Sequence, residues 1–344
     1  MKKLFYIIIL IIFIFGNRIY SQKIQNQSDI IKSLANSTTI KLPYGDKNVL
    51  YKFPEKWDIS RLTKQKKDKQ NVDTDSVFNI LNAFTYQDLE YSKRKSIVTQ
   101  YPANKIFLEP DFIISDSVKK FNKNIEFRSL KVLSKTKFSL FSIMFKGDID
   151  CNKCEFVEHQ TQNVLLTIGK DNIIKDKLLI SYINGSDLGQ ASRFFVIDTK
   201  EIIHQKSFKS DELGVTFTGY EKYQINENGN FIRYYEKNGN FKTDTELGFV
   251  KNNKRQGKWI EIKENKYLYN WVKSQKDKKD YPDYYTYMEA NYKDGLAIGE
   301  AKFFKLIQKY DQNGQPILSS RKKGKLIYTE TFDNGKIKDR KFLK

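Results

Sequence analysis

Asn-Gly and Asp-Gly pairs recur through the last third of this 344-residue chain, and they constrain its fold more than any other feature. Such pairs accept positive φ angles at both central positions of a two-residue turn, so they are the strongest short-range signal for a β-hairpin. The pairs are Asn228-Gly229, Asn238-Gly239, Asp294-Gly295, Asn313-Gly314 and Asn334-Gly335. Their spacing predicts a series of consecutive hairpins over residues 221–344.

Three segments of this region also repeat one another. Residues 250–262 read VKNNKRQGKWIEI, residues 292–304 read YKDGLAIGEAKFF, and residues 332–342 read FDNGKIKDRKF. They resemble MORN repeats, in the variant form where an aromatic-x-x-Gly turn precedes Gly-x-Trp and an aromatic strand. The copies depart from that pattern, because Asn253 stands in place of Gly, Ala301 replaces Trp, and Asp339 replaces the second Gly. A Lys-rich insertion at residues 273–280 also interrupts the array. The resemblance implies an elongated single-layer sheet of hairpins that contacts proteins or membrane surfaces and does not act in catalysis.

The middle of the chain also follows a β pattern after one helical segment. Residues 73–93 begin with Asp and Ser helix caps and carry apolar residues at helical spacing, which predicts a helix. Short apolar runs between Asp, Asn, Gly and Lys turns then predict strands near residues 105–108, 127–133, 138–145, 164–168, 177–183, 193–197, 215–217, 220–225 and 231–235. Residues 165–178 and 194–203 each read as a strand, an Asp-centred turn and an Ile-Ile pair, which suggests a two-fold hairpin repeat. We therefore expect a mainly β protein, in which an antiparallel meander or sandwich-like domain precedes the array.

The N-terminus has the pattern of a secretory signal. Lys2 and Lys3 precede a continuous apolar run over residues 4–15, and Ser21 lies at a polar boundary. The run is shorter than the roughly 20 apolar residues of a membrane span. We expect a signal peptide at 1–22, a polar segment and linker at 23–72, the helix and β-rich domain at 73–220, and the array at 221–344. The expected locations are periplasmic, outer-surface or secreted, with no transmembrane span after signal removal.

The two cysteines, Cys151 and Cys154, lie close together. In an oxidising compartment such a pair is most simply a disulfide, although free or redox-active thiols and a metal site are alternatives. A zinc site would need two further ligands, and His159 and His204 are the chain's only histidines.

The formal charge of +20 fits an anionic partner, or the Lys, Asn, Ile, Tyr and Phe usage typical of an AT-rich genome. Export and the lack of a recognisable nucleic-acid module argue against nucleic acid. The expected partners are an envelope protein, peptidoglycan or an anionic lipid surface.

Aromatic residues of the array alternate with other residues, as expected for one face of a sheet. They can stack on one another across strands or form a binding stripe for sugar rings or peptide. The candidates for partner binding are Trp259, Tyr267, Tyr269, Trp271, Tyr285 and Tyr287.

Motifs for catalysis are sparse. The chain has no Gly-x-Ser-x-Gly elbow and no phosphate-binding Gly-rich loop, and we assign no catalytic, cofactor-binding or metal-ligating residue. The sequence favours an exported, non-enzymatic binding or scaffold protein. The alternative is a secreted hydrolase for polysaccharide or peptide, with paired carboxylates in residues 100–220.

Overall fold

A computed structural model describes residues 23–24, 31, 34, 37, 39–46, 48–51, 97–100, 120–121, 124–150, 158–186, 189–211, 214–264, 285–312 and 316–343. Over these residues the chain is mainly β, with two open sheets whose strands are almost all antiparallel. The predicted fold class, including the hairpin array, is therefore confirmed. The predicted signal peptide, the helix at 73–93, the strand at 105–108, Cys151, Cys154 and the insertion at 273–280 lie outside the described residues.

The chain divides into two compact units, which we describe separately. Unit 1 comprises Met1–Tyr220 and Ile225–Phe231, and unit 2 comprises Glu221–Gln224 and Ile232–Lys344. No helix within the described residues is long and apolar enough to cross a membrane.

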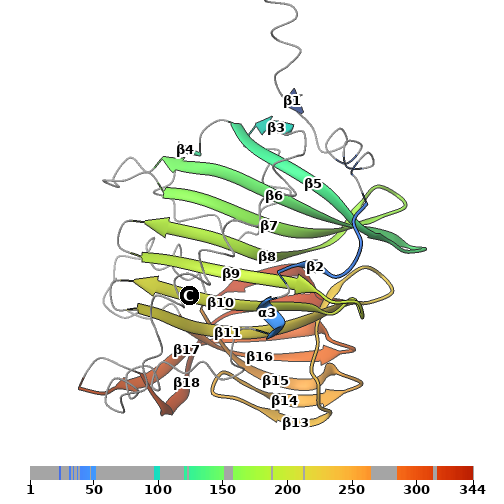
Figure 1. Ribbon diagram of the computed structural model, residues 1–344. Coiled ribbons are helices and arrows are strands. Elements are labelled where there is room, and N and C mark those ends of the chain that lie inside the picture. The colour runs from blue at the N-terminus through green and yellow to red at the C-terminus, as the bar shows by residue number, and fades with distance from the viewer. Residues whose placement is uncertain are drawn as a thin grey trace, which may run out of the picture. The chain divides into compact units, whose positions relative to one another are not determined.

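The first sheet is a meander in which β5 to β11 lie side by side in chain order (Figure 1). Its long strands are β5 (Asn124–Ser134), β6 (Phe138–Asp150), β7 (Glu158–Gly169), β8 (Ile174–Ser186), β9 (Gly189–Ile197), β10 (Ile203–Asp211) and β11 (Gly214–Ile225). Its short elements are β1 (Lys23–Ile24), β2 (Tyr44–Gly45), β3 (Ile97–Gln100), β4 (Lys120–Phe121) and β12 (Phe231–Arg233), and helix α3 (Asn48–Tyr51) precedes β3. Only β1 with β3 is a parallel pair among the strand pairings whose register is established.

Two strands of this sheet differ from the sequence prediction. β10 was not predicted as a strand because three polar residues in a row, His204, Gln205 and Lys206, follow Ile203, yet all four are buried. The Gln205 side chain donates to the carbonyl of Leu179 at 3.0 Å, so hydrogen bonding compensates part of its burial. The two short strands predicted at 215–217 and 220–225 are one continuous strand, β11.

The two Asp-centred turns form as the sequence suggested. Asp171 lies in the turn between β7 and β8, where its Oδ1 accepts the N–H of Ile173 at 3.1 Å. Asp198 lies between β9 and β10, and its Oδ1 accepts the N–H groups of Lys200 and Ile202 at 2.8 and 2.9 Å. Carboxylate groups that bond their own backbone in this way stabilise turns, so the two hairpins share one local mechanism.

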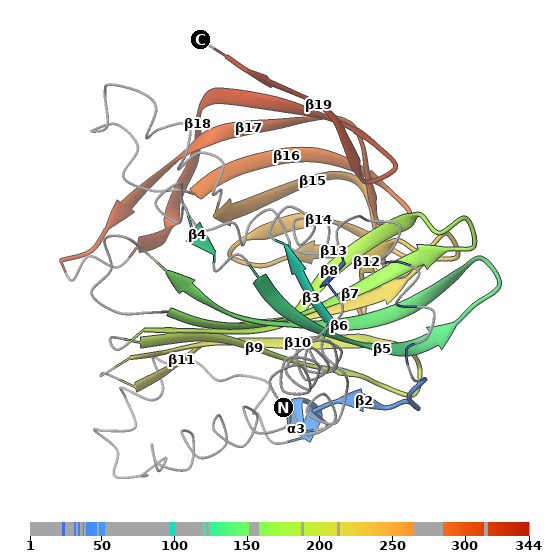
Figure 2. The same ribbon diagram turned by 90° about the horizontal axis from the view of Figure 1, so that it is seen from above.

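The second sheet lies in unit 2 and runs β13-β14-β15-β16-β17-β18-β19 in chain order. Its strands are β13 (Gly239–Lys242), β14 (Glu246–Lys251), β15 (Lys254–Glu264), β16 (Tyr285–Lys293), β17 (Leu296–Tyr310), β18 (Pro316–Asp333) and β19 (Lys336–Phe342). In Figure 2, β17 and β18 bend along their length.

Each of the three sequence copies is a hairpin of this sheet. Both turn residues have positive φ in all three, at 55° and 61° for Asn252-Asn253, 53° and 86° for Asp294-Gly295, and 49° and 82° for Asn334-Gly335. Asn253 fits the Gly position because asparagine tolerates the left-handed region better than most residues. Its side chain also donates to the carbonyl of Tyr235 at 2.6 Å.

The second Gly of each copy marks a β-bulge. Gly257 and Gly299 both have φ of +66°, and at both places one residue of the preceding strand lies opposite three residues of the next. In the third copy, where Asp339 replaces the Gly, the register shifts by a single residue and Asp339 has no positive φ. The loss of one glycine thus accompanies a smaller bulge.

Candidate functional site

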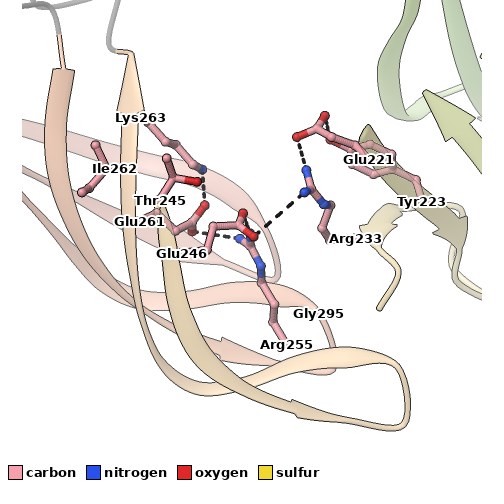
Figure 3. A pocket seen from close by; sticks show the side chains of 10 residues that line it. All are labelled: Glu221, Tyr223, Arg233, Thr245, Glu246, Arg255, Glu261, Ile262, Lys263 and Gly295. Atoms are coloured by element: carbon pink, nitrogen blue, oxygen red, sulfur yellow. Dashed lines mark hydrogen bonds and ion pairs between the residues drawn. The ribbon is translucent and has the colours of Figure 1, made fainter. Parts of the chain in front are cut away.

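Unit 2 contains a charged pocket of about 380 Å³ (Figure 3). Three cationic and three carboxylate side chains dominate its lining. The lining residues are Glu221, Tyr223, Arg233, Thr245, Glu246, Arg255, Glu261, Ile262, Lys263 and Gly295.

Arg255 organises the pocket from the start of β15. Its side chain is only 7% exposed, and its Nε donates to the hydroxyl of Tyr235 at 2.6 Å. Nη1 donates to Glu261 at 2.8 Å and to the hydroxyl of Tyr292 at 3.0 Å. Nη2 donates to Glu246 at 2.6 Å. Four bonds in the plane of the guanidinium, two of them to carboxylates, fix this side chain in one orientation.

Aromatic rings enclose the same guanidinium. Its central carbon lies 4.7 Å from the ring centroid of Trp259, 4.9 Å from that of Tyr292 and 5.8 Å from that of Tyr235. Cations are attracted to ring faces at such distances, and the attraction strengthens when water is excluded. The charge of Arg255 is therefore compensated by carboxylates in its plane and by aromatic rings around it.

Glu261 is the buried anion of the network, with 1% of its side chain exposed. Oε1 accepts from Arg255 and from the Tyr292 hydroxyl at 2.8 and 2.6 Å, and Oε2 contacts Lys263 Nζ at 2.9 Å. Burial alone would raise the pKa of this carboxyl, but the charges of Lys263 and Arg255 outweigh it and lower the pKa to about 2. Burial in turn raises the pKa of the Tyr292 hydroxyl.

Arg233 links a second set of charges to the first. Its guanidinium pairs with Glu221 through Nη1 and lies 3.9 Å from Glu246 through Nη2. The Tyr223 hydroxyl donates to Glu221 at 2.9 Å, and the Tyr223 ring lies 5.5 Å from the guanidinium carbon. Although burial opposes its charge, the carboxylates raise the pKa of Arg233, so the group stays cationic.

The chemistry of the pocket is that of a fixed ionic network. A general acid needs a carboxyl pKa raised towards the working pH, whereas the pKa of Glu261 is lowered to about 2. Glu261 is therefore suited to holding two cations in place and not to donating a proton. The hydrolase alternative placed its carboxylates in residues 100–220, outside this pocket, and stays a prediction.

Of the six predicted binding aromatics, Tyr267, Tyr269 and Trp271 lie outside the described residues. The other three differ in their exposure to solvent. Trp259 is fully buried, and its ring packs at a tilt against those of Tyr235 and Phe241 and edge-on against that of Tyr292. Tyr285, in contrast, is 44% exposed. Trp259 is therefore part of the core of unit 2, whereas Tyr285 is accessible.

The opposite side of the sheet from Trp259 carries Tyr287. In β15 and β16, Trp259 pairs with Ala290, while Ile262 pairs with Tyr287, an odd number of residues away, so the two side chains leave the sheet on opposite sides. Tyr287 is half-buried, and its ring lies 6.4 Å from that of Phe304 on β17. Sequence spacing alone had placed Trp259 and Tyr287 together.

The Trp259 ring lies directly on the backbone of Gly248 in β14. A Cβ atom at Gly248 would lie only 2.2 Å from the nearest ring atom. In the second copy, Ala290 and Ala301 occupy the corresponding places, so a smaller pair fills the same layer. In the third copy the place is taken by Glu330 and Arg340, which form an ion pair at 2.5 Å.

A second polar cluster, in unit 1, was missed from the sequence. His204 Nε2 lies 2.9 Å from Asp198 Oδ2, and His204 Nδ1 lies 2.8 Å from the Tyr220 hydroxyl. Asp198 has a lowered pKa, because hydrogen bonds from His204 and two backbone N–H groups outweigh the effect of burial. Asp198 also holds the β9–β10 turn, so this cluster has a structural role that the Asp-centred turn pattern could have indicated.

No family model, curated protein or solved structure matches this chain. The resemblance to MORN repeats therefore remains a prediction from the sequence. Within the described ranges, no group of three or more His, Cys, Asp or Glu side chains is placed to hold a metal ion.

Proposed function

We propose that this chain is an exported binding or scaffold protein of the cell envelope or secretome, and that unit 2 provides its contact surface without performing catalysis. Export rests on the N-terminal signal pattern. Sequencing the N-terminus of protein recovered from the periplasm or medium tests it, with cleavage expected near Ser21.

The distribution of exposed apolar side chains supports the contact surface. Among the residues whose side chains the structure describes, ten large apolar side chains are exposed, and all but Ile173 belong to unit 2. These nine are Leu247, Phe249, Tyr285, Ile307, Tyr310, Ile317, Leu318, Ile337 and Phe342. Water-exposed apolar groups gathered on one part of a molecule mark interaction sites.

The outer face of the array is the side of β14–β17 opposite Trp259. Leu247 and Phe249 lie on it, 45% and 46% exposed, and Leu247 pairs with Ile260 of the next strand. Glu289 lies on the same face between Lys258 and Lys323, at 3.3 and 2.8 Å. An apolar ridge beside a row of alternating charges is suited to a protein or polymer partner.

The ionic network behind this face supports a scaffold role. Arg255 and Glu261 contact side chains of β14 and β16 as well as of their own strand β15, so they hold three neighbouring strands together. A rigid sheet presents its outer residues in a fixed pattern, which lowers the entropy lost on binding.

A paired substitution tests the outer face. Leu247→Ser with Phe249→Ser should remove partners that the wild-type protein captures from envelope extracts. Ile173→Ser is the matched control, because Ile173 is equally exposed but lies on unit 1. Retention of every partner by the double variant, with unchanged thermal stability, would count against the proposal.

A further inference from the structure

Within the described residues, the hairpin of β17 and β18 extends beyond its neighbours β16 and β19 (Figure 2). The pairing of β16 with β17 ends at Thr286 and Lys305, and the pairing of β18 with β19 ends at Tyr328 and Phe342. Beyond those points β17 and β18 pair with each other as far as Tyr310 and Pro316. We call residues 306–310 and 317–325 the arm.

The arm exposes apolar side chains at its far end. Ile307 is 49% exposed, Tyr310 43%, Ile317 38% and Leu318 43%. Four of the ten exposed large apolar side chains thus lie on one two-stranded projection. A two-stranded ribbon has little core of its own, so these side chains are not needed to stabilise the arm by packing.

Basic residues surround this apolar end. Lys309 lies directly opposite Ile317, and Lys322 lies opposite Ile307. Lys323 and Lys325 follow on β18 and are exposed, with Lys323 paired to Glu289 at 2.8 Å. Residues 306–310 and 317–325 contain no acidic residue, and the exposed Asp311 follows Tyr310 at the end of the arm. Apolar groups next to several cations are the combination by which peripheral proteins bind anionic membranes, since the apolar groups enter the interface and the cations stay among the head groups.

The arm is also held in place. The Arg321 side chain donates through Nε to Gln308 at 3.2 Å and through Nη1 to the carbonyl of Asp244 at 3.0 Å. The first bond joins the two strands of the arm, and the second ties the arm to the turn between β13 and β14. The exposed groups are therefore presented on a fixed support.

A peptide strand added to the arm's edge is the competing arrangement. Three register shifts interrupt the β17–β18 ladder, at Phe303/Phe304, Phe304/Leu306 and Ile307/Lys309. Bulges, together with lysines along an edge, are features by which sheets avoid pairing with further strands. The geometry therefore favours docking of the arm on a surface over pairing of its edge with an added peptide strand.

We infer that the β17–β18 arm docks on anionic lipid membranes, with Ile307 and Leu318 inserting into the interface and Lys309 and Lys322 contacting the head groups. This inference rests on the proposal that unit 2 is a contact surface, and it names a partner for one part of that unit.

Vesicle co-sedimentation tests the inference with the full chain. Vesicles of phosphatidylglycerol and phosphatidylcholine should bind the protein, and vesicles of phosphatidylcholine alone should bind it at least tenfold more weakly. Lys309→Gln with Lys322→Gln should weaken binding to the anionic vesicles by roughly thirtyfold, because each cation near such a surface contributes about fivefold. Ile307→Ser with Leu318→Ser should weaken it by about tenfold or more. All variants carry the same N-terminal apolar run, so its own affinity for lipid is common to every sample.

The controls separate this inference from the proposed function. Leu247→Ser with Phe249→Ser changes the outer face and should leave vesicle binding unchanged, even if it abolishes capture of protein partners. Arm variants that bind vesicles as the wild type does, with wild-type circular dichroism, would overturn the inference. Absence of vesicle binding by the wild type would overturn it too. If polyphosphate competes with the vesicles for the protein, and if the Ile307 and Leu318 substitutions do not change vesicle binding, the arm would instead bind a soluble anionic polymer. That result would refute lipid docking.

Discussion

Replacing Glu261 by Gln should destabilise unit 2 by about 3 kcal/mol at pH 7. The carboxyl pKa is lowered from 4.5 to about 2 in the folded protein, and each unit of pKa difference corresponds to about 1.36 kcal/mol. The substitution keeps the shape of the side chain but removes the anion that Arg255 and Lys263 share, so Arg255 retains Glu246 alone as its counter-ion. Urea unfolding gives the global value, and hydrogen exchange of peptides over residues 246–264 reports whether the loss lies at β14 and β15.

The pH dependence supplies the stricter test of Glu261. A carboxyl with a lowered pKa contributes stability that is fully present above its unfolded pKa of 4.5 and is lost as the pH falls through about 2. The difference between wild type and Glu261→Gln should therefore shrink to about half at pH 3.

An exposed pair provides the control. Glu300 lies 3.5 Å from Lys302 and is 53% exposed, so Glu300→Gln should cost less than about 0.5 kcal/mol. A Glu261→Gln effect below about 1 kcal/mol, or one that does not vary between pH 7 and pH 3, would refute the ionic network as a stabilising element.

Three further substitutions test other parts of the two sheets. Gly248→Ala should destabilise the protein by about 2 kcal/mol in urea unfolding, because its Cβ would meet the Trp259 ring. Gly219→Ala, in strand β11 with nothing within 4 Å of the added Cβ, should leave the stability unchanged or raise it by up to about 1 kcal/mol. Gly257→Ala should cost about 1 kcal/mol in thermal melts although the space is open, because φ there is +66°; an unchanged melting temperature would contradict this. Asp198→Ala should cost about 1–2 kcal/mol by removing two turn hydrogen bonds and the contact with His204. Because the pKa of Asp198 is lowered, that cost should be present at neutral pH and decrease in acid.

The hairpins could be read from the sequence because they depend on local backbone preferences. Asp294-Gly295 and Asn334-Gly335 take up positive φ in the structure as their residue types require. Even the departure at Asn253 follows from the same chemistry, since asparagine reaches the left-handed region at modest cost.

The pocket could not be read from the sequence because its partners are distant along the chain. Arg255 contacts Tyr235 and Tyr292, which lie 20 and 37 positions away. Strand β10 was missed for a related reason, because its polar residues are buried by bonds to other strands, such as that of Gln205 to Leu179. Local patterns report turns, whereas the compensation of buried charge depends on which strands become neighbours.

Arg255 makes the first hairpin of the array chemically different from the other two. It occupies the place that Ala297 and Ile337 hold in the other copies, and it needs Glu246 and Glu261 around it. A gene duplication that repeated the first hairpin alone would copy Glu246 and Glu261 together with Arg255, but not Tyr235 and Tyr292, which lie outside that hairpin and accept from the same guanidinium. An added copy of the second kind, in which alanines fill the same layer, needs no such distant partners.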